Sequence, residues 1–222
     1  MTVAIGMICK DGIVLGADRQ VTFPEGYKYE EQKILWSEAV DWRILLTYTS
    51  DPGFAKEVHQ ELPRRLDIEN VNSQLAHQKI DGILTGMGRP YGDVGTSLLI
   101  AVHVKDENAC LWKFDGKWLH SADGFDCLGV GDSSLIRYLS HTLYSCDMTV
   151  QDGAKVAVYL VSRANKYVDK CSGGPDIVTL THGGEVRFLD AAKVFELVIT
   201  MESMEPDALN EIIRAGRISR SP

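Results

Sequence analysis

The chain has 222 residues, of which 45% are hydrophobic, and its formal net charge is −8. This length and composition suit one compact domain over residues 1–222 with a sizeable core, with two small domains as the alternative. The acidic balance and the lack of a basic run argue against nucleic acid or an anionic membrane as the main partner, because both attract clustered Lys and Arg.

Cysteine usage and hydropathy indicate the compartment. The five cysteines are odd in number, include no Cys-x-x-Cys pair and lie mostly in apolar surroundings, which is typical of buried thiols in a reducing compartment. We find no signal-peptide pattern at the N-terminus and no apolar run of membrane-spanning length. We therefore expect a soluble cytoplasmic protein without a membrane partner.

The first residues combine a hydroxyl with an apolar hairpin. Removal of Met1 would leave Thr2 with a hydroxyl and a free α-amine, a nucleophile that carries its own base. Apolar, β-rich runs at 3–9 and 13–17 flank an Asp-Gly turn signal, which predicts a hairpin. The hairpin would return the chain towards Thr2 and end at Asp18.

The run from Thr2 to Thr22 closely resembles the start of a mature proteasome β-type subunit, an N-terminal-nucleophile hydrolase. The shared features are the threonine, the turn, the two strands and an Asp-Arg-x-x-Thr tail formed by Asp18, Arg19 and Thr22. The resemblance implies that Thr2 is the catalytic nucleophile and that Arg19 and Thr22 belong to the substrate-binding region. Without it, Thr2 would merely begin an edge strand, and Asp18 and Arg19 would be surface charges.

A polar, turn-rich segment at 20–32 is expected to form a surface loop before Lys33. In the family a lysine at this place lies beside the threonine and is bridged by the aspartate that corresponds to Asp18. Such a lysine would disfavour protonation of a nearby amine and stabilise a developing alkoxide. The loop is one residue shorter than usual in the family, and without the resemblance Lys33 reads as a surface lysine at a strand start.

The next apolar run, 42–50, is predicted to be a strand that ends at the substrate site. The family places a glycine after this strand, and its backbone N–H binds the oxyanion; Ser50 stands there in this chain. A main-chain donor does not require glycine, although the serine side chain and nearby Pro52 are expected to narrow the pocket or misaim the donor. Tyr48 corresponds to the residue at the floor of the specificity pocket, or is simply a core aromatic.

Helices are predicted next, followed by an antiparallel meander. Helical spacing of apolar residues covers 54–66, where Pro63 is expected to end or kink the helix, and 71–84. A glycine-rich segment at 86–92 should then break the second helix. Alternating apolar residues and turn signals predict strands at 96–104, 109–114, 117–121 and 127–130.

The second half of the chain carries two further glycine-rich junctions. The segment 129–134 leads into a predicted helix at 135–145, and Val130 occupies a position where the family usually has a supporting serine. A strongly amphipathic helix at 150–168 precedes Asp169, Ser172 and two glycines. The resemblance implies that Asp169 and Ser172 form hydrogen bonds around the catalytic threonine. The alternative is that they are surface polar residues at the C-terminal cap of the helix.

After strands at 177–181 and 186–188, a helical tail is predicted from 191 to about 218, interrupted near Pro206. The pattern alone indicates an α+β fold with a mostly antiparallel sheet. The resemblance adds the four-layer αββα sandwich of the N-terminal-nucleophile hydrolases.

The resemblance implies a threonine endopeptidase that acts on polypeptides inside homo-oligomeric rings, with a regulatory ATPase as a possible partner. No cofactor is expected, and no metal site either, because His59 and His77 have no partner at metal-ligand spacing. Two alternatives remain open: a same-fold amidase that acts on a small molecule, since fold does not fix substrate, and a catalytically silent subunit that retains Met1.

Overall fold

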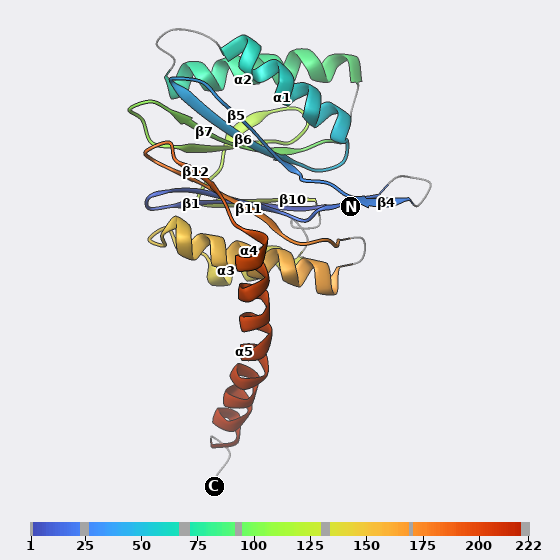
Figure 1. Cartoon of the computed structure of the whole chain (residues 1–222), viewed down its shortest axis with the longest axis vertical. Helices are drawn as coiled ribbons and strands as arrows, with labels where there is room; N and C mark the ends of the chain where they lie inside the picture. Colours follow the sequence, from blue (N-terminus) through green and yellow to red (C-terminus); the bar gives the residue numbers. More distant parts are fainter. Residues whose placement is uncertain are drawn as a thin grey trace.

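The structure is a computed structural model that describes residues 2–22, 27–66, 72–91, 95–129, 134–168 and 171–218, without the side chains of 88–91, 134 and 205–218. It is an α+β fold of four layers, with two β-sheets stacked face to face between two layers of helices (Figure 1). Each sheet has five strands, and all their pairings are antiparallel.

The sheet that begins at the N-terminus has the strand order β10-β1-β2-β11-β12. The Asp11-Gly12 turn joins β1 to β2, and Gly12 lies so close to the next strand that a Cβ there would come within 2.2 Å of the Leu180 carbonyl oxygen. The strands of this sheet are β1 (Val3–Cys9), β2 (Gly12–Ala17), β10 (Phe125–Gly129), β11 (Asp176–Thr181) and β12 (Val186–Phe188).

The other sheet follows the chain order, β5-β6-β7-β8-β9. Its strands are β5 (Ile34–Glu38), β6 (Trp42–Tyr48), β7 (Leu98–Val104), β8 (Cys110–Phe114) and β9 (Leu119–Ser121). A separate two-stranded ribbon, β3 (Gln20–Thr22) with β4 (Lys28–Glu30), lies where the chain crosses from the first sheet to the second.

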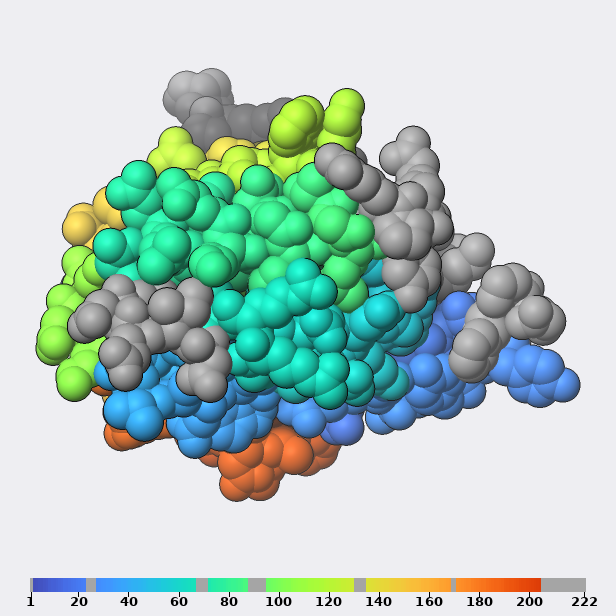
Figure 2. Space-filling model, turned by 90° about the horizontal axis from the view of Figure 1, so that it is seen from above, coloured from blue at the N-terminus to red at the C-terminus, as the bar shows by residue number. Residues whose placement is uncertain are grey.

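The helices form the two outer layers. Helices α1 (Pro52–Leu66) and α2 (Ser73–Tyr91) lie side by side and cover one outer face (Figure 2). Helices α3 (Ser134–Leu143) and α4 (Val150–Tyr167) cover the opposite face, and α5 (Ala191–Ile218) packs on α4 before it projects away from the body (Figure 1). No helix in the described part of the chain is long and apolar enough to cross a membrane.

Three apolar clusters occupy the spaces between the four layers. Leu46 and Phe54 belong to the cluster between α1, α2 and their sheet, and Val158 and Ile177 belong to the one between the other sheet and α4. The third cluster fills the space between the sheets and includes Leu15, Leu45 and Val178. Buried apolar side chains therefore make most of the contact between the two sheets, and the Lys113–Asp126 ion pair (2.7 Å) also joins them.

Several predicted boundaries were wrong. Pro63 does not end α1, which continues to Leu66, and α2 runs through Gly86 to Tyr91 instead of stopping at the glycine-rich segment. The tail is one continuous helix through Pro206. The segment 20–32 contains the short ribbon β3–β4 in place of an unstructured loop. Packing against the sheet overrides the helix-breaking signals in α1 and α2, and strand pairing overrides the loop signal at 20–32.

Candidate active site

The β1–β2 hairpin brings Thr2 and Asp18 together. The register pairs Ala4 with Ala17, so the residues just outside the two strands face each other at the same end of the sheet. The Val3 N–H donates to Asp18 Oδ1 (3.0 Å), and the Asp18 N–H donates to the Val3 carbonyl (3.2 Å). These reciprocal bonds fix the carboxylate beside Thr2.

Lys33 reaches the same point from the other sheet, where it directly precedes β5. Its Nζ donates to Thr2 Oγ1 (2.9 Å), Asp18 Oδ1 (2.9 Å) and the Gln20 carbonyl (2.5 Å). An ammonium has three N–H donors, and each has an acceptor here. The side chain of Lys33 is 1% exposed, that of Asp18 0%, and Thr2 is 8% exposed, so the whole cluster is removed from bulk water.

Burial shifts both charged groups towards neutrality. It lowers the pKa of Lys33 below its usual value, and it raises the pKa of Asp18, because a buried charge loses its hydration. The opposite charge and the hydrogen bonds between Lys33 and Asp18 act against both shifts. Each group therefore stabilises the charged form of the other against burial.

A cavity of about 430 Å³ opens beside this cluster. Much of its wall is formed by small polar residues. It is lined by Thr2, Val21, Thr22, Lys33, Tyr48, Thr49, Ser50, Pro52, Gly95, Ser97 and Gly129. An extended chain with a small or medium side chain fits such a volume.

The cavity contains three of the four residues predicted to bind substrate. Ser50 and Thr22 line its wall, and Tyr48 lines it while belonging also to the apolar cluster under α1. The Tyr48 hydroxyl is buried without a hydrogen-bond partner, and burial raises the pKa of this phenol. Arg19, the fourth residue, lies outside this cavity, and its Nε is 3.7 Å from Asp176 Oδ1.

Ser172 is connected to the cluster through Gln20. Its hydroxyl donates to Gln20 Oε1, and its carbonyl accepts the N–H groups of Gln20 (3.0 Å) and Arg19 (3.3 Å). Gln20 Nε2 in turn donates to Thr22 Oγ1 (3.0 Å). Ser172 therefore supports the backbone on which Asp18 is held, while Asp169 and Val130 lie outside the described residues.

Sequence reasoning missed two residues of the site. Gln20 supplies the carbonyl that binds Lys33 and the amide that binds Ser172, and its place two residues after Asp18 was the only signal. Gly129 has φ +64°, and a Cβ there would lie 2.2 Å from the Thr2 carbonyl oxygen. The glycine-rich junction 129–134 was noticed, but its close approach to Thr2 follows only from the β1–β10 pairing.

Comparison with known proteins relates the chain to a proteasome beta subunit by sequence and to Anbu proteins by fold. No family model matches the chain. Proteasome subunit beta 1 from Pyrobaculum arsenaticum is 22% identical over 193 residues, which cover 82% of this chain and 90% of the relative. An Anbu mutant from Hyphomicrobium sp. strain MC1 superposes with a TM-score of 0.79 at 13% identity, over 95% of this chain and 97% of that one.

The chain has the Anbu fold. Anbu from Yersinia bercovieri, described as an ancestral beta-subunit, has a TM-score of 0.75 at 13% identity and covers 99% of this chain and 97% of its own. The Anbu complex of Pseudomonas aeruginosa, solved as a helical assembly, has a TM-score of 0.73 at 12% identity, over 94% and 96% of the two chains. The Anbu fold is related to that of proteasome β subunits, which supports in part the proteasome-type resemblance of residues 2–22.

Proposed function

We propose that the chain is a threonine-type peptide hydrolase in which Thr2, exposed by removal of the residue before it, is the nucleophile. The observation that supports this most directly is the 2.9 Å hydrogen bond from Lys33 Nζ to Thr2 Oγ1 inside a buried, fully hydrogen-bonded cluster. The oxygen of a nucleophile must carry negative charge during attack, and an ammonium held at this distance would stabilise that charge.

In the proposed mechanism the Thr2 α-amine accepts the hydroxyl proton and Oγ attacks the peptide carbonyl. A free α-amine has a pKa of about 7.7–8, so it can act as a base near neutral pH. The Ser50 backbone N–H stabilises the oxyanion, and the positive charge of Lys33 stabilises the developing alkoxide. The leaving amine takes the proton from the α-amine. Water then hydrolyses the ester on Thr2 and restores the hydroxyl.

Blocking the amine tests this proposal most sharply. We expect Thr2→Ala to lose peptide hydrolysis while folding normally, and Thr2→Ser to retain part of it, because the hydroxyl survives without the γ-methyl that restricts χ1. A tag fused before Thr2 that cannot be removed should silence hydrolysis as fully as Thr2→Ala. A peptide epoxyketone should add to the N-terminal peptide, as detected by intact mass and peptide mapping.

Normal hydrolysis by the tagged protein, or a label on Cys171 or Ser172, would contradict the mechanism. Retention of Met1 in the purified native protein, together with no hydrolysis, would favour the catalytically silent subunit. Hydrolysis of small amides but not of peptides would favour the amidase.

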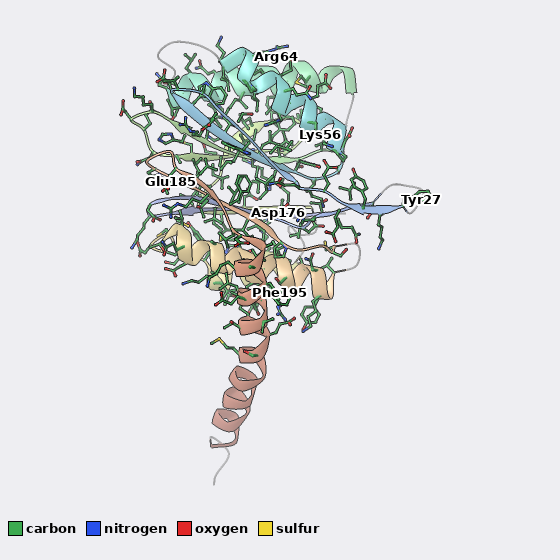
Figure 3. All side chains as sticks on the ribbon, in the orientation of Figure 1. Tyr27, Lys56, Arg64, Asp176, Glu185 and Phe195 are labelled. Carbon is green, nitrogen blue, oxygen red and sulfur yellow. The ribbon has the colours of Figure 1, made fainter. Side chains whose placement is uncertain are left out.

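We further propose that the chain works as a single domain in a large homo-oligomer that encloses the sites and limits which polypeptides reach them. Supporting this, three large apolar side chains of α5 are exposed: Phe195 by 66%, Ile199 by 50% and Met204 by 63% (Figure 3 labels Phe195). Such a surface is typical of a contact with another subunit. Light scattering at micromolar concentration should give a large particle, and Phe195→Asp should reduce its mass; a monomeric wild type would favour the amidase.

A further inference from the structure

The turn that carries the proposed oxyanion donor is bound at three consecutive residues to one neighbouring segment. The Thr49 N–H donates to the Ser97 carbonyl (3.0 Å), the Ser50 hydroxyl to the Gly95 carbonyl (3.1 Å) and the Asp51 N–H to Thr96 Oγ1 (3.4 Å). We call these three bonds the 49–51 clamp. Ser50, Gly95 and Ser97 line the same cavity as Thr2 and Lys33, so the clamp forms part of its wall.

Ser50 has an unusual backbone conformation for a residue with a side chain. Its φ is +74°, in the left-handed region that glycine adopts freely and that costs free energy for other residues. The described residues contain one other non-glycine case, Asp106. A strained conformation persists only where neighbouring bonds hold it, and the clamp provides such bonds.

The chain on either side of Ser50 is also fixed. Tyr48 ends β6 in register with Leu98 of β7. On the other side, Asp51 caps α1: its Oδ1 accepts the Gly53 N–H (2.7 Å), and its carbonyl accepts the Ala55 N–H (3.3 Å). The neighbours of the peptide unit between Thr49 and Ser50 are thus fixed on both sides, and the Ser50 hydroxyl is a side-chain group that restrains this unit.

We infer that Ser50 is a positioning residue whose hydroxyl, bound to the Gly95 carbonyl, holds its own backbone N–H in the direction needed to stabilise the oxyanion at Thr2. This rests on the proposed function. The Ser50 hydroxyl donates to the Gly95 carbonyl. This hydrogen bond holds at residue 50 a positive φ that a glycine would adopt without help. Reorienting a main-chain donor weakens transition-state binding more than substrate binding, so the effect belongs to kcat and not to KM.

The test compares three single variants. Ser50→Ala removes the hydroxyl but keeps a side chain at positive φ. We expect kcat to fall about tenfold and KM to stay within about twofold of wild type. Ser50→Gly removes the hydroxyl and also the free-energy cost of a side chain at positive φ, so it should recover most of the wild-type kcat. Thr142→Ala is the control, because this exposed threonine on α3 also donates its hydroxyl to a backbone carbonyl, that of Tyr138 (2.9 Å), away from the cavity.

A crystal structure of Ser50→Ala gives a second readout that does not depend on activity. We expect residue 50 to leave the left-handed region and its N–H to turn away from Thr2. Ser50→Ala with unchanged φ, or with wild-type kcat in an active enzyme, would overturn the inference. If the wild type neither hydrolyses peptides nor reacts at Thr2, the proposed function fails, and the φ of residue 50 in the variant still decides whether the hydroxyl holds the turn.

Discussion

The adjacent residues Asp18 and Arg19 each form an ion pair, and the two pairs differ sharply in how completely they are hydrogen-bonded. Asp18 pairs with Lys33 at 2.9 Å, and every donor of the ammonium has an acceptor. Arg19 pairs with Asp176 at 3.7 Å, and both Arg19 Nε and Asp176 Oδ2 are buried without a hydrogen-bond partner. The first pair lies between the sheets, and the second lines a cavity of about 770 Å³ bordered by α4 and α5.

The difference shows what makes a buried charge tolerable. Asp18 is fully buried, but it accepts from Lys33 and from the Val3 and Gln20 N–H groups, which replace its lost hydration. Asp176 lies on β11 and lines the same cavity as Phe195 of α5; Figure 3 labels both residues. Burial raises the pKa of Asp176, and the charges of Arg19 and Lys33 and a backbone hydrogen bond from Lys33 oppose this shift. We expect function to depend on the first pair and to depend little on the second.

The largest effect should come from breaking the first pair. Lys33→Ala and Asp18→Asn should each abolish hydrolysis and lower the free energy of unfolding by about 3–5 kcal/mol, because each strands a buried group. Lys33→Arg should also fail, since the wide guanidinium does not fit the ammonium's place. Urea unfolding and peptide turnover measure these effects. Lys155→Ala, at an exposed pair with Asp152, is the control; near-normal turnover in Lys33→Ala would show that the cluster is not catalytic.

Moving Thr2 without touching a charge should have the next largest effect. Gly129→Ala adds a Cβ at φ +64° only 2.2 Å from the Thr2 carbonyl oxygen, so the strand end must shift. We expect turnover to fall about 100-fold and the free energy of unfolding to fall by about 1–3 kcal/mol. In Gly82→Ala, by contrast, the new methyl group on α2 meets no neighbour within 4 Å, and both quantities should stay close to wild type or rise.

The second pair should respond weakly. The Arg19 side chain is 40% exposed, so Asp176→Asn should change the free energy of unfolding by about 1 kcal/mol or less. Because burial raises the pKa of Asp176, the folded protein binds this proton more tightly than the unfolded chain. The contribution of Asp176 to stability is therefore full below its unfolded pKa and is lost as pH rises through its folded pKa. Unfolding curves from pH 3 to 7 should be flatter in Asp176→Asn; a loss as large as that in Asp18→Asn would make the two pairs equivalent.

The smallest effect concerns Cys171, which adjoins the cluster. Burial and the Asp18 charge raise the pKa of this thiol from 9.0 to about 11, so it is protonated at neutral pH and unreactive. At pH 8, iodoacetamide should modify exposed Cys146 long before Cys171, as followed by peptide mass, and Cys171→Ser should keep most of the activity. Rapid modification of Cys171 with loss of turnover would point to a cysteine nucleophile instead.

The residue pattern predicted an α+β fold with a mostly antiparallel sheet, and the predicted hairpin returned Asp18 towards Thr2. The four-layer order and the place of Lys33 beside these two residues came from the resemblance to proteasome β-type subunits. The sequence did not predict the contacts that are made through the main chain. The partners of the Gln20 carbonyl, of the Ser50 hydroxyl and of Gly129 depend on sheet register, which residue type alone does not give. Asp176 was not singled out either, because the cavity that it lines depends on how α5 packs beside α4. Helices α1 and α2 continue past Pro63 and Gly86 because tertiary packing outweighs a local signal.

The placement of Lys33 has one more consequence. Thr2 and Asp18 belong to one sheet and Lys33 to the other, and the layer between the sheets is filled by apolar side chains such as Leu45 and Val178. The 2.9 Å hydrogen bond from Lys33 Nζ to Thr2 Oγ1 crosses from one sheet to the other, so its length depends on the distance between the sheets. Loosening of the apolar layer by heat, pressure or a cavity would first lengthen this bond, so chemical competence would be lost while both sheets remained intact.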